Sequence, residues 1–520
     1  MRNSAGKRLV GSICAAALLA PMPLGNAKTL RQPAADTAMQ SDLCRRPAAL
    51  PILKPERSNQ QNNQNSRDRV MSEASPPMMA PPPSPPPPVA MPGPVVTGSR
   101  MESDASSRSD KPVAEGAIAV GKIDSGARTV DAREDERMMP EYPLPMPRPT
   151  PYPQSGLLTA GEHDDLLNPE LYAEYIRNSG LGQSTPDLPR LDTERLLTIV
   201  AKDARGQAMP FVPVEVRCAN GKSIVLPTVA DGSSVFFPEL DRLGRSVQVR
   251  AGNSNWRTVD LASAQGTQTI GFTLGGRAEL VRKLDLAVVV DVTGSMSDEL
   301  RFLQAELASI VKALGRNHRD LDIRVGFTFY RDQGDQFVTR TYPLSSDMNA
   351  ATAYIEQQSA NGGGDYPEAM EEAMIRTAGQ PWRDDAVKTM LLVADAPPHD
   401  QDVGMTWRAA EHLRAERVHI VPVGASGVAD LAEYLMRAMA ASTQSRYTFL
   451  TDDSGIGNVH AKPAVDCYLV TRLDALLRRV IDSQISGRRI EPDSDEIIRS
   501  VGQYDAGRCI LPADFGQNHQ

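Results

Sequence analysis

The stretch that decides the fold is Leu286-Ala-Val-Val-Val290, followed at once by the polar run Asp291-Val-Thr-Gly-Ser295. Five consecutive apolar residues predict a strand buried on both faces, because a strand with one solvated face would alternate apolar and polar residues. Apolar residues then recur at helical spacing over residues 300–314, which predicts a helix directly after the strand. A buried strand followed by a helix is the repeating unit of an α/β sheet.

The same alternation continues towards the C-terminus. Further β-prone runs are each accompanied by a helical stretch and occupy residues 389–394, 418–423 and 447–450. Residues 325–330 and 336–342 flank Arg331-Asp-Gln-Gly-Asp335, a pattern typical of a hairpin. An amphipathic helix over residues 473–485 would close the unit. We therefore expect an α/β doubly wound, Rossmann-like domain with a mostly parallel sheet over residues 283–486.

The segments on either side have a different character. Residues 194–275 hold short β-prone runs separated by turn signals such as Asn220-Gly221 and Asp231-Gly232, which predicts a small all-β sandwich. Residues 156–193 are expected to be a short helical linker, with one helix after Pro169. The tail at 487–520 receives no structural assignment.

The N-terminal part predicts export. Residues 1–27 combine a basic start, an apolar run and the small residues Gly25-Asn-Ala27, as a signal peptide does, so cleavage is expected before Lys28. Residues 28–155 are rich in proline and are expected to be a disordered spacer or, less simply, a ligand for a proline-binding module. The mature chain would then be periplasmic, secreted or on the cell surface, with no transmembrane segment.

Charge and cysteine content narrow the class of partner. A net charge of −9 argues against nucleic acid, which needs a concentrated basic surface, and leaves a protein partner as the expectation. Signal cleavage leaves Cys44, Cys218, Cys467 and Cys509. In an oxidising compartment these could form two disulfides, of which Cys467–Cys509 is the preferred pair, or they could stay as buried thiols.

Polar residues gather where the predicted strands end. Asp291, Thr293 and Ser295 follow the first strand, and Asp395 follows the strand at 389–394. Ligands of doubly wound folds collect at the carboxyl ends of the strands, so these oxygens are expected to converge. A loop between them, Gly362-Gly-Gly-Asp-Tyr-Pro-Glu368, offers Asp365 as a further carboxylate. Hard cations such as Mg²⁺ prefer oxygen ligands of this kind.

The run Asp291-Val-Thr-Gly-Ser-Met296 resembles the metal-ion-dependent adhesion site (MIDAS) of von Willebrand factor A domains, with Asp395 at the place of the distant aspartate. The distant threonine has no match, because its loop carries Asp365, as in the hemicentin-like branch. The resemblance covers roughly residues 157–486. Over this range the chain resembles a group of bacterial cell-envelope proteins, and its β-domain looks like the carboxypeptidase-regulatory type. It implies Mg²⁺, or Mn²⁺ or Ca²⁺, held by Asp291, Thr293, Ser295, Asp365 and Asp395.

The aspartate in place of threonine has a physical consequence. A third carboxylate would weaken the pull of the cation on an acidic ligand, unless Asp365 binds through water or only caps a loop. The expected function is metal-dependent binding or adhesion to a protein partner, without enzymatic activity, because the sequence contains no H-E-x-x-H, phosphate-loop or G-x-S-x-G pattern. Two alternatives stay open: an envelope scaffold whose metal only stabilises the fold, and a metal-assisted hydrolase using His399 or His460.

Overall fold

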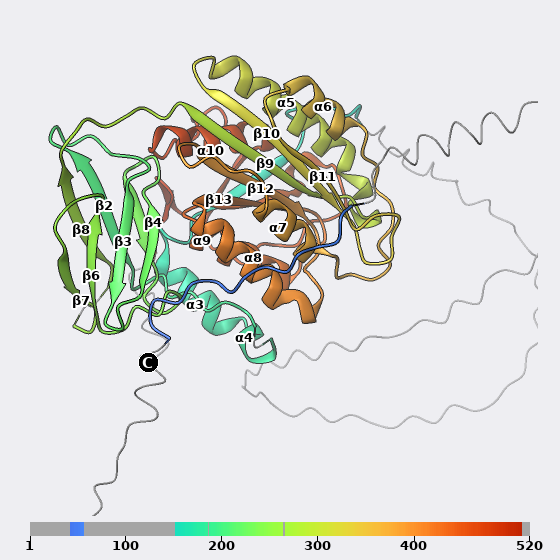
Figure 1. Ribbon diagram of the computed structural model, residues 1–520. Coiled ribbons are helices and arrows are strands. Elements are labelled where there is room, and N and C mark those ends of the chain that lie inside the picture. The colour runs from blue at the N-terminus through green and yellow to red at the C-terminus, as the bar shows by residue number, and fades with distance from the viewer. Residues whose placement is uncertain (1–41, 57–150, 186, 264–265, 512–520) are drawn as a thin grey trace, which may run out of the picture. The chain divides into compact units, whose positions relative to one another are not determined.

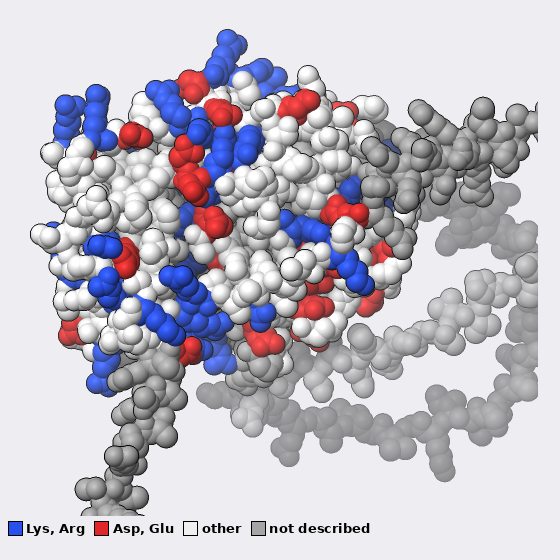
Figure 2. Space-filling view, viewed as in Figure 1, with Lys and Arg blue, Asp and Glu red and all other residues white. Residues whose placement is uncertain are grey.

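The computed structural model describes residues 42–56, 151–185, 187–263 and 266–511 (Figure 1). The predicted signal peptide and most of the proline-rich region lie outside these residues. On the face seen in Figure 2, basic and acidic side chains are interspersed. Within the described ranges, no helix combines the length and apolarity needed to cross a bilayer.

The described residues form a nine-stranded mixed sheet in the order β11-β10-β9-β12-β13-β14-β1-β15-β16. Neighbouring strands from β10 to β14 run parallel, and β11 folds back on β10 as the predicted hairpin. Their bounds are β9 Lys283–Asp291, β10 Asp322–Tyr330, β11 Thr339–Ser345, β12 Val387–Ala394, β13 Val418–Gly424 and β14 Tyr447–Thr451. The predicted α/β class is confirmed.

Helices cover both faces of this sheet, as the apolar run in β9 requires (Figure 1). Val288 and Val290 face a core with helices α5 (Leu300–Asn317), α6 (Met348–Glu356) and α10 (Leu473–Ser486). Val289 faces a second core with α7 (Met370–Ala378), α8 (Val403–Ala415) and α9 (Asp430–Ser442). Burial on both faces fixes β9 inside the sheet, between β10 and β12, so its carboxyl end is rigidly placed.

The segment predicted as a helical linker contributes a strand to the sheet instead. Strand β1 (Thr159–His163) lies antiparallel between β14 and β15 (Tyr468–Arg472). Only then do helices α3 (Pro169–Asn178) and α4 (Leu181–Ser184) follow. A search for apolar runs does not find strand β1, because the strand contains the charged residue Glu162. This glutamate is buried and paired with arginines far along the chain: Arg446 at 2.6 Å and Arg479 at 3.1 Å.

The C-terminal tail also joins the fold. Strand β16 (Arg499–Val501) pairs with β15 at the sheet edge, and β17 (Tyr504–Asp505) pairs with β18 (Arg508–Cys509). The disulfide Cys467–Cys509 ties this tail to the sheet, with a Cα–Cα distance of 5.6 Å. The preferred cysteine pair is thus confirmed.

Residues 197–274 form two sheets with one shared apolar core. One sheet has the order β5-β2-β8 and the other β4-β3-β6-β7. Alternate residues of β2 are buried, as expected for strands with one face on a core. The bounds are β2 Leu197–Asp203, β3 Pro213–Cys218, β4 Ser223–Pro227, β5 Ser233–Phe236, β6 Ser246–Ala251, β7 Arg257–Asp260 and β8 Gln268–Leu274.

Residues 42–56 depart from the disorder expected for 28–155. They run without helix or strand and are held at several points. Cys44 is disulfide-bonded to Cys218, and the Ala48 carbonyl lies 2.8 Å from His412 Nε2. Glu56 Oε1 accepts a hydrogen bond of 2.6 Å from the Thr341 hydroxyl. The covalent link and these polar contacts hold the segment, and Leu50 and Leu53 pack against the apolar core.

Candidate metal centre

The two predicted aspartates leave the sheet side by side. Strands β9 and β12 are parallel neighbours, with Val290 opposite Val393. Asp291 ends β9 and Asp395 follows the last residue of β12. Both carboxylates therefore lie at the same edge of the sheet, where the short helix η1 (Gly294–Asp298) begins. The convergence expected from the sequence is what the topology produces.

A chain of hydrogen bonds orders the first three candidate ligands. Asp291 Oδ1 accepts from the Thr293 amide at 2.9 Å and from the Thr293 hydroxyl at 2.6 Å. The hydroxyl oxygens of Thr293 and Ser295 are 3.0 Å apart. Asp291 and Thr293 are fully buried, whereas Ser295 is exposed. The turn thus presents one carboxylate and two hydroxyls from a backbone fixed by its own contacts.

The carboxylates at this edge carry uncompensated negative charge. Burial, and next the charge of Asp395, raise the pKa of Asp291. Burial also raises the pKa of Asp395, and the Ser295 hydroxyl only partly offsets this. Asp291 Oδ2 and Asp395 Oδ1 are buried and have no hydrogen-bond partner among the described residues. Two buried acceptors with excess charge are the chemistry that a divalent cation satisfies.

Glu368 is a third buried carboxylate that the sequence analysis did not assign to the site. Burial, and next the charge of Asp291, raise its pKa to about 9. A Cβ placed on Gly363 would lie 2.8 Å from Glu368 Oε1 and 3.5 Å from Thr293 Cβ, so the glycine loop packs between these two side chains. The only sequence signal for Glu368 is its position just after the glycine run.

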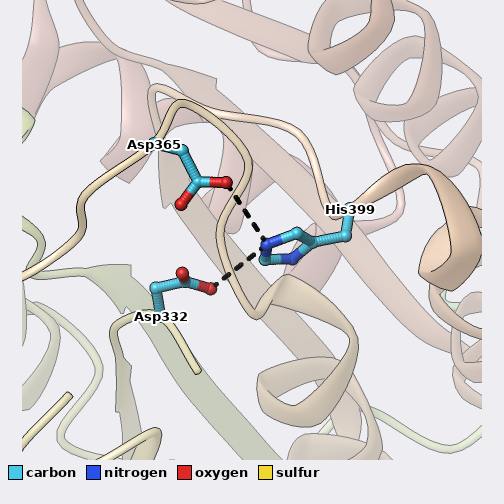
Figure 3. Close-up of side chains that lie close together, drawn as sticks. All are labelled: Asp332, Asp365 and His399. Atoms are coloured by element: carbon cyan, nitrogen blue, oxygen red, sulfur yellow. Dashed lines mark ion pairs between the residues drawn. The ribbon is translucent and has the colours of Figure 1, made fainter. Parts of the chain in front are cut away.

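Asp365 is placed differently from the sequence prediction. Figure 3 shows its carboxylate turned towards His399, with Oδ2 3.9 Å from His399 Nε2. Its side chain is 66% exposed, while that of its neighbour Glu368 is buried. Gly362 and Gly363 both adopt positive φ, which turns the loop so that Glu368 and not Asp365 faces inwards. The other four predicted ligands are brought together, and Asp365 joins a separate group with Asp332.

A histidine from the loop after β14 contacts the residue that precedes α5. His460 lies between two carboxylates: its Nε2 is 2.6 Å from Glu299 Oε1 and its Nδ1 is 2.8 Å from Asp452 Oδ1. Nearby, Asp298 Oδ2 accepts from the Asn458 amide at 2.6 Å. These contacts fasten the loop after β14 to the start of α5. Both ring nitrogens of His460 therefore lie within ion-pair distance of a carboxylate.

Comparison with known families agrees with this geometry. The family model of the von Willebrand factor type A domain matches residues 285–461. These residues form a von Willebrand factor type A domain. The matched range runs from strand β9 to the loop that carries His460, so it encloses Asp291, Thr293, Ser295 and Asp395. The hemicentin-like and carboxypeptidase-regulatory resemblances stay predictions from the sequence.

The chain also has curated relatives. It is similar to the alpha-protein kinase vwkA of Dictyostelium discoideum, with 30% identity over 118 residues, and to a putative ariadne-like RING finger protein R811 of Acanthamoeba polyphaga mimivirus, with 35% identity over 119 residues. Each match covers 22% of this chain, but 19% of the first relative and 11% of the second. The chain thus spans less than a fifth of the length of either relative.

Two solved structures are among those similar to the chain. One is BatB from Bacteroides thetaiotaomicron, at 13% identity and a TM-score of 0.27, covering 39% of this chain and 98% of that one. The other is the pilus adhesin SpaC from Lactobacillus rhamnosus GG, at 12% identity and a TM-score of 0.28, covering 46% of this chain and 31% of that one.

Proposed function

We propose that the A domain is a binding module that holds one divalent cation and uses it to engage a protein partner. Asp291, Thr293, Ser295 and Asp395 would hold the cation, with Mg²⁺ as the preferred ion and Mn²⁺ or Ca²⁺ as substitutes. The observation that supports this is the pair of buried, unpartnered oxygens of Asp291 and Asp395 at one end of adjacent strands.

The donor set fits a hard cation. It consists of oxygens only, two from carboxylates and two from hydroxyls, and Mg²⁺ completes such a set with water. A position occupied by water can be taken by a carboxylate of a partner. A bound cation would favour the ionised form of Glu368, whose pKa is otherwise raised to about 9, and the resulting negative charge would reduce the residual positive charge of the cation. We therefore expect an acidic partner group to bind more weakly here than at a site with two carboxylates.

Two further features support a non-catalytic role outside the cytoplasm. His460, one of the two candidates for a hydrolase base, has both ring nitrogens against carboxylates and so is poorly placed to take a proton from water. All four cysteines beyond residue 27 are paired as Cys44–Cys218 and Cys467–Cys509. Disulfides persist in oxidising compartments, so we propose a periplasmic or cell-surface protein that is exported by its N-terminal segment.

Calorimetric titration with Mg²⁺ and Mn²⁺ tests the proposal. Wild type should bind one equivalent, and Asp291→Asn should lose this binding. The matched control is Asp400→Asn, which removes an exposed carboxylate from the same end of the sheet. Equal binding by wild type and Asp291→Asn would refute the site.

Cross-linking of the mature chain to cell-envelope proteins then separates the remaining functions. A binding module should lose its partner with chelator and in Asp291→Asn. A scaffold with a structural metal should melt earlier with chelator but keep its partner. A hydrolase would show turnover that His399→Ala or His460→Ala abolishes.

A further inference from the structure

We propose that Asp332, Asp365 and His399 form a second divalent-metal site, of the zinc-binding class, beside the Asp291–Asp395 centre. Its three ligands come from three separate loops at the same end of the sheet: the turn between β10 and β11, the glycine-rich loop, and the segment between β12 and α8 (Figure 3). The site is independent of the proposed adhesion function, because it shares no ligand with it.

The separations between ligand atoms fit a shared ion better than direct contact. His399 Nε2 lies 3.6 Å from Asp332 Oδ1 and 3.9 Å from Asp365 Oδ2, and the three ligand atoms all lie within 4.8 Å of one another. A hydrogen bond between such atoms would bring them to about 2.7–3.2 Å. Two ligands at about 2.1 Å from one tetrahedral Zn²⁺ are about 3.4 Å apart. The distances between the ligand atoms are therefore close to those expected around one bound metal ion.

An unpartnered buried oxygen points into this space. Asp332 is only 8% exposed, and its Oδ1 has no hydrogen-bond partner within the described part of the chain. The backbone of Asp332 is fixed, since its amide donates to Asp335 Oδ2 at 3.2 Å. Figure 3 shows the Asp332 carboxylate directed at His399. A buried carboxylate oxygen without a hydrogen-bond donor costs free energy. A metal ion between the three ligands would satisfy it.

The ligand types select a different ion from that of the Asp291 centre. One imidazole with two carboxylates favours Zn²⁺, Co²⁺ or Ni²⁺, whereas the oxygen-only set favours Mg²⁺. Three protein ligands leave the fourth tetrahedral position for water. Because Asp365 is largely exposed, an ion can enter from solvent. A bound ion would join three loops and fix the glycine-rich loop, which also carries Glu368.

Cobalt is the probe for this site, because tetrahedral Co²⁺ absorbs visible light and reports its ligands. Untagged protein would be titrated with Co²⁺ in the presence of millimolar Mg²⁺, which occupies the oxygen-only centre. We expect one equivalent to bind in wild type, and at least about tenfold weaker binding in His399→Gln and Asp332→Asn. Circular dichroism would check that each variant is folded, and Asp365→Asn, on an exposed loop, serves if a buried substitution prevents folding.

Two matched controls separate this site from other binding. His318→Gln alters a histidine that has a single carboxylate partner, Asp482 at 2.7 Å, and should leave Co²⁺ binding unchanged. Asp291→Asn removes the oxygen-only centre and should also leave it unchanged. The inference is overturned if His399→Gln binds Co²⁺ like wild type. It is equally overturned if Asp291→Asn abolishes Co²⁺ binding, because the ion would then belong to the first centre.

Discussion

Substitution of Asp291 by asparagine should stabilise the protein in chelator, and this advantage should shrink or reverse when a divalent cation is present. Asparagine keeps Oδ1 as acceptor for the amide and hydroxyl of Thr293, so the local hydrogen bonds survive. The substitution removes one negative charge from a fully buried position beside Asp395. In chelator the variant should therefore be more stable than wild type.

The magnitude follows from the raised pKa of Asp291. Folding raises the pKa of Asp291 from 3.8 to about 7, and each pKa unit corresponds to about 1.4 kcal/mol, so the substitution is predicted to gain up to about 4 kcal/mol in chelator at pH 8. With Mg²⁺ at a hundred times its dissociation constant, wild type gains about 2.7 kcal/mol and the variant gains none. The stability advantage of Asp291→Asn over wild type should then become small or reverse.

The pH dependence supplies a check on the cause. Because folding raises the pKa of Asp291, the native state binds its proton more tightly than the unfolded chain does. Wild type in chelator therefore loses stability as pH rises above the unfolded pKa of about 3.9. The advantage of Asp291→Asn should accordingly vanish near pH 4 and grow towards pH 8.

Urea unfolding followed by circular dichroism, with chelator and with Mg²⁺, measures these differences. Asp400→Asn is the control and should change the free energy of unfolding by no more than about 0.5 kcal/mol. The reasoning is refuted if Asp291→Asn is less stable than wild type in chelator and still gains stability from Mg²⁺.

Three other perturbations test the fold around the site. Burial alone would raise the pKa of Glu162, but the guanidinium groups led by Arg446 lower it to about 2. Glu162→Gln should therefore lower the free energy of unfolding by about 3 kcal/mol at pH 7. Acid titrations of both proteins should show this difference shrinking as pH falls from about 4.5 towards 2. Cys467→Ser opens the disulfide of the C-terminal tail and should cost about 2–4 kcal/mol in urea unfolding without reductant; an unchanged midpoint would mean that the tail adds nothing. Gly161→Ala would put a Cβ 2.5 Å from the Phe449 ring, so a loss of about 1–3 kcal/mol is expected, and a neutral effect would contradict the packing of β1.

The core of the A domain could be predicted because its signals are local. The apolar run of β9 and the helical spacing of α5 each depend on one short segment, and their periods are distinct. Strand β1 could not be predicted in this way. Its residues Thr159–His163 are buried but mostly polar, and they become compatible with the core only through arginines almost three hundred residues away. No local pattern encodes such a partner.

The metal centre could likewise be predicted only in part from the sequence. Asp291 and Asp395 follow from topology, because the carboxyl ends of neighbouring parallel strands must meet. The choice between Asp365 and Glu368 depends on the conformation of one loop, which is set by positive φ at Gly362 and Gly363. Each carboxylate lies in the same seven-residue motif, so the sequence shows that an acid is present but not which one turns inwards.

Anomalous diffraction from crystals soaked with Mn²⁺ tests the central claim most directly. Manganese replaces magnesium at oxygen sites and is located by its own scattering. We predict a peak between the carboxylates of Asp291 and Asp395, at about 2.0–2.2 Å from at least one protein oxygen. Ordered side chains with no peak at this position, or carboxylates turned away from each other, would contradict a cation-dependent binding site in this domain.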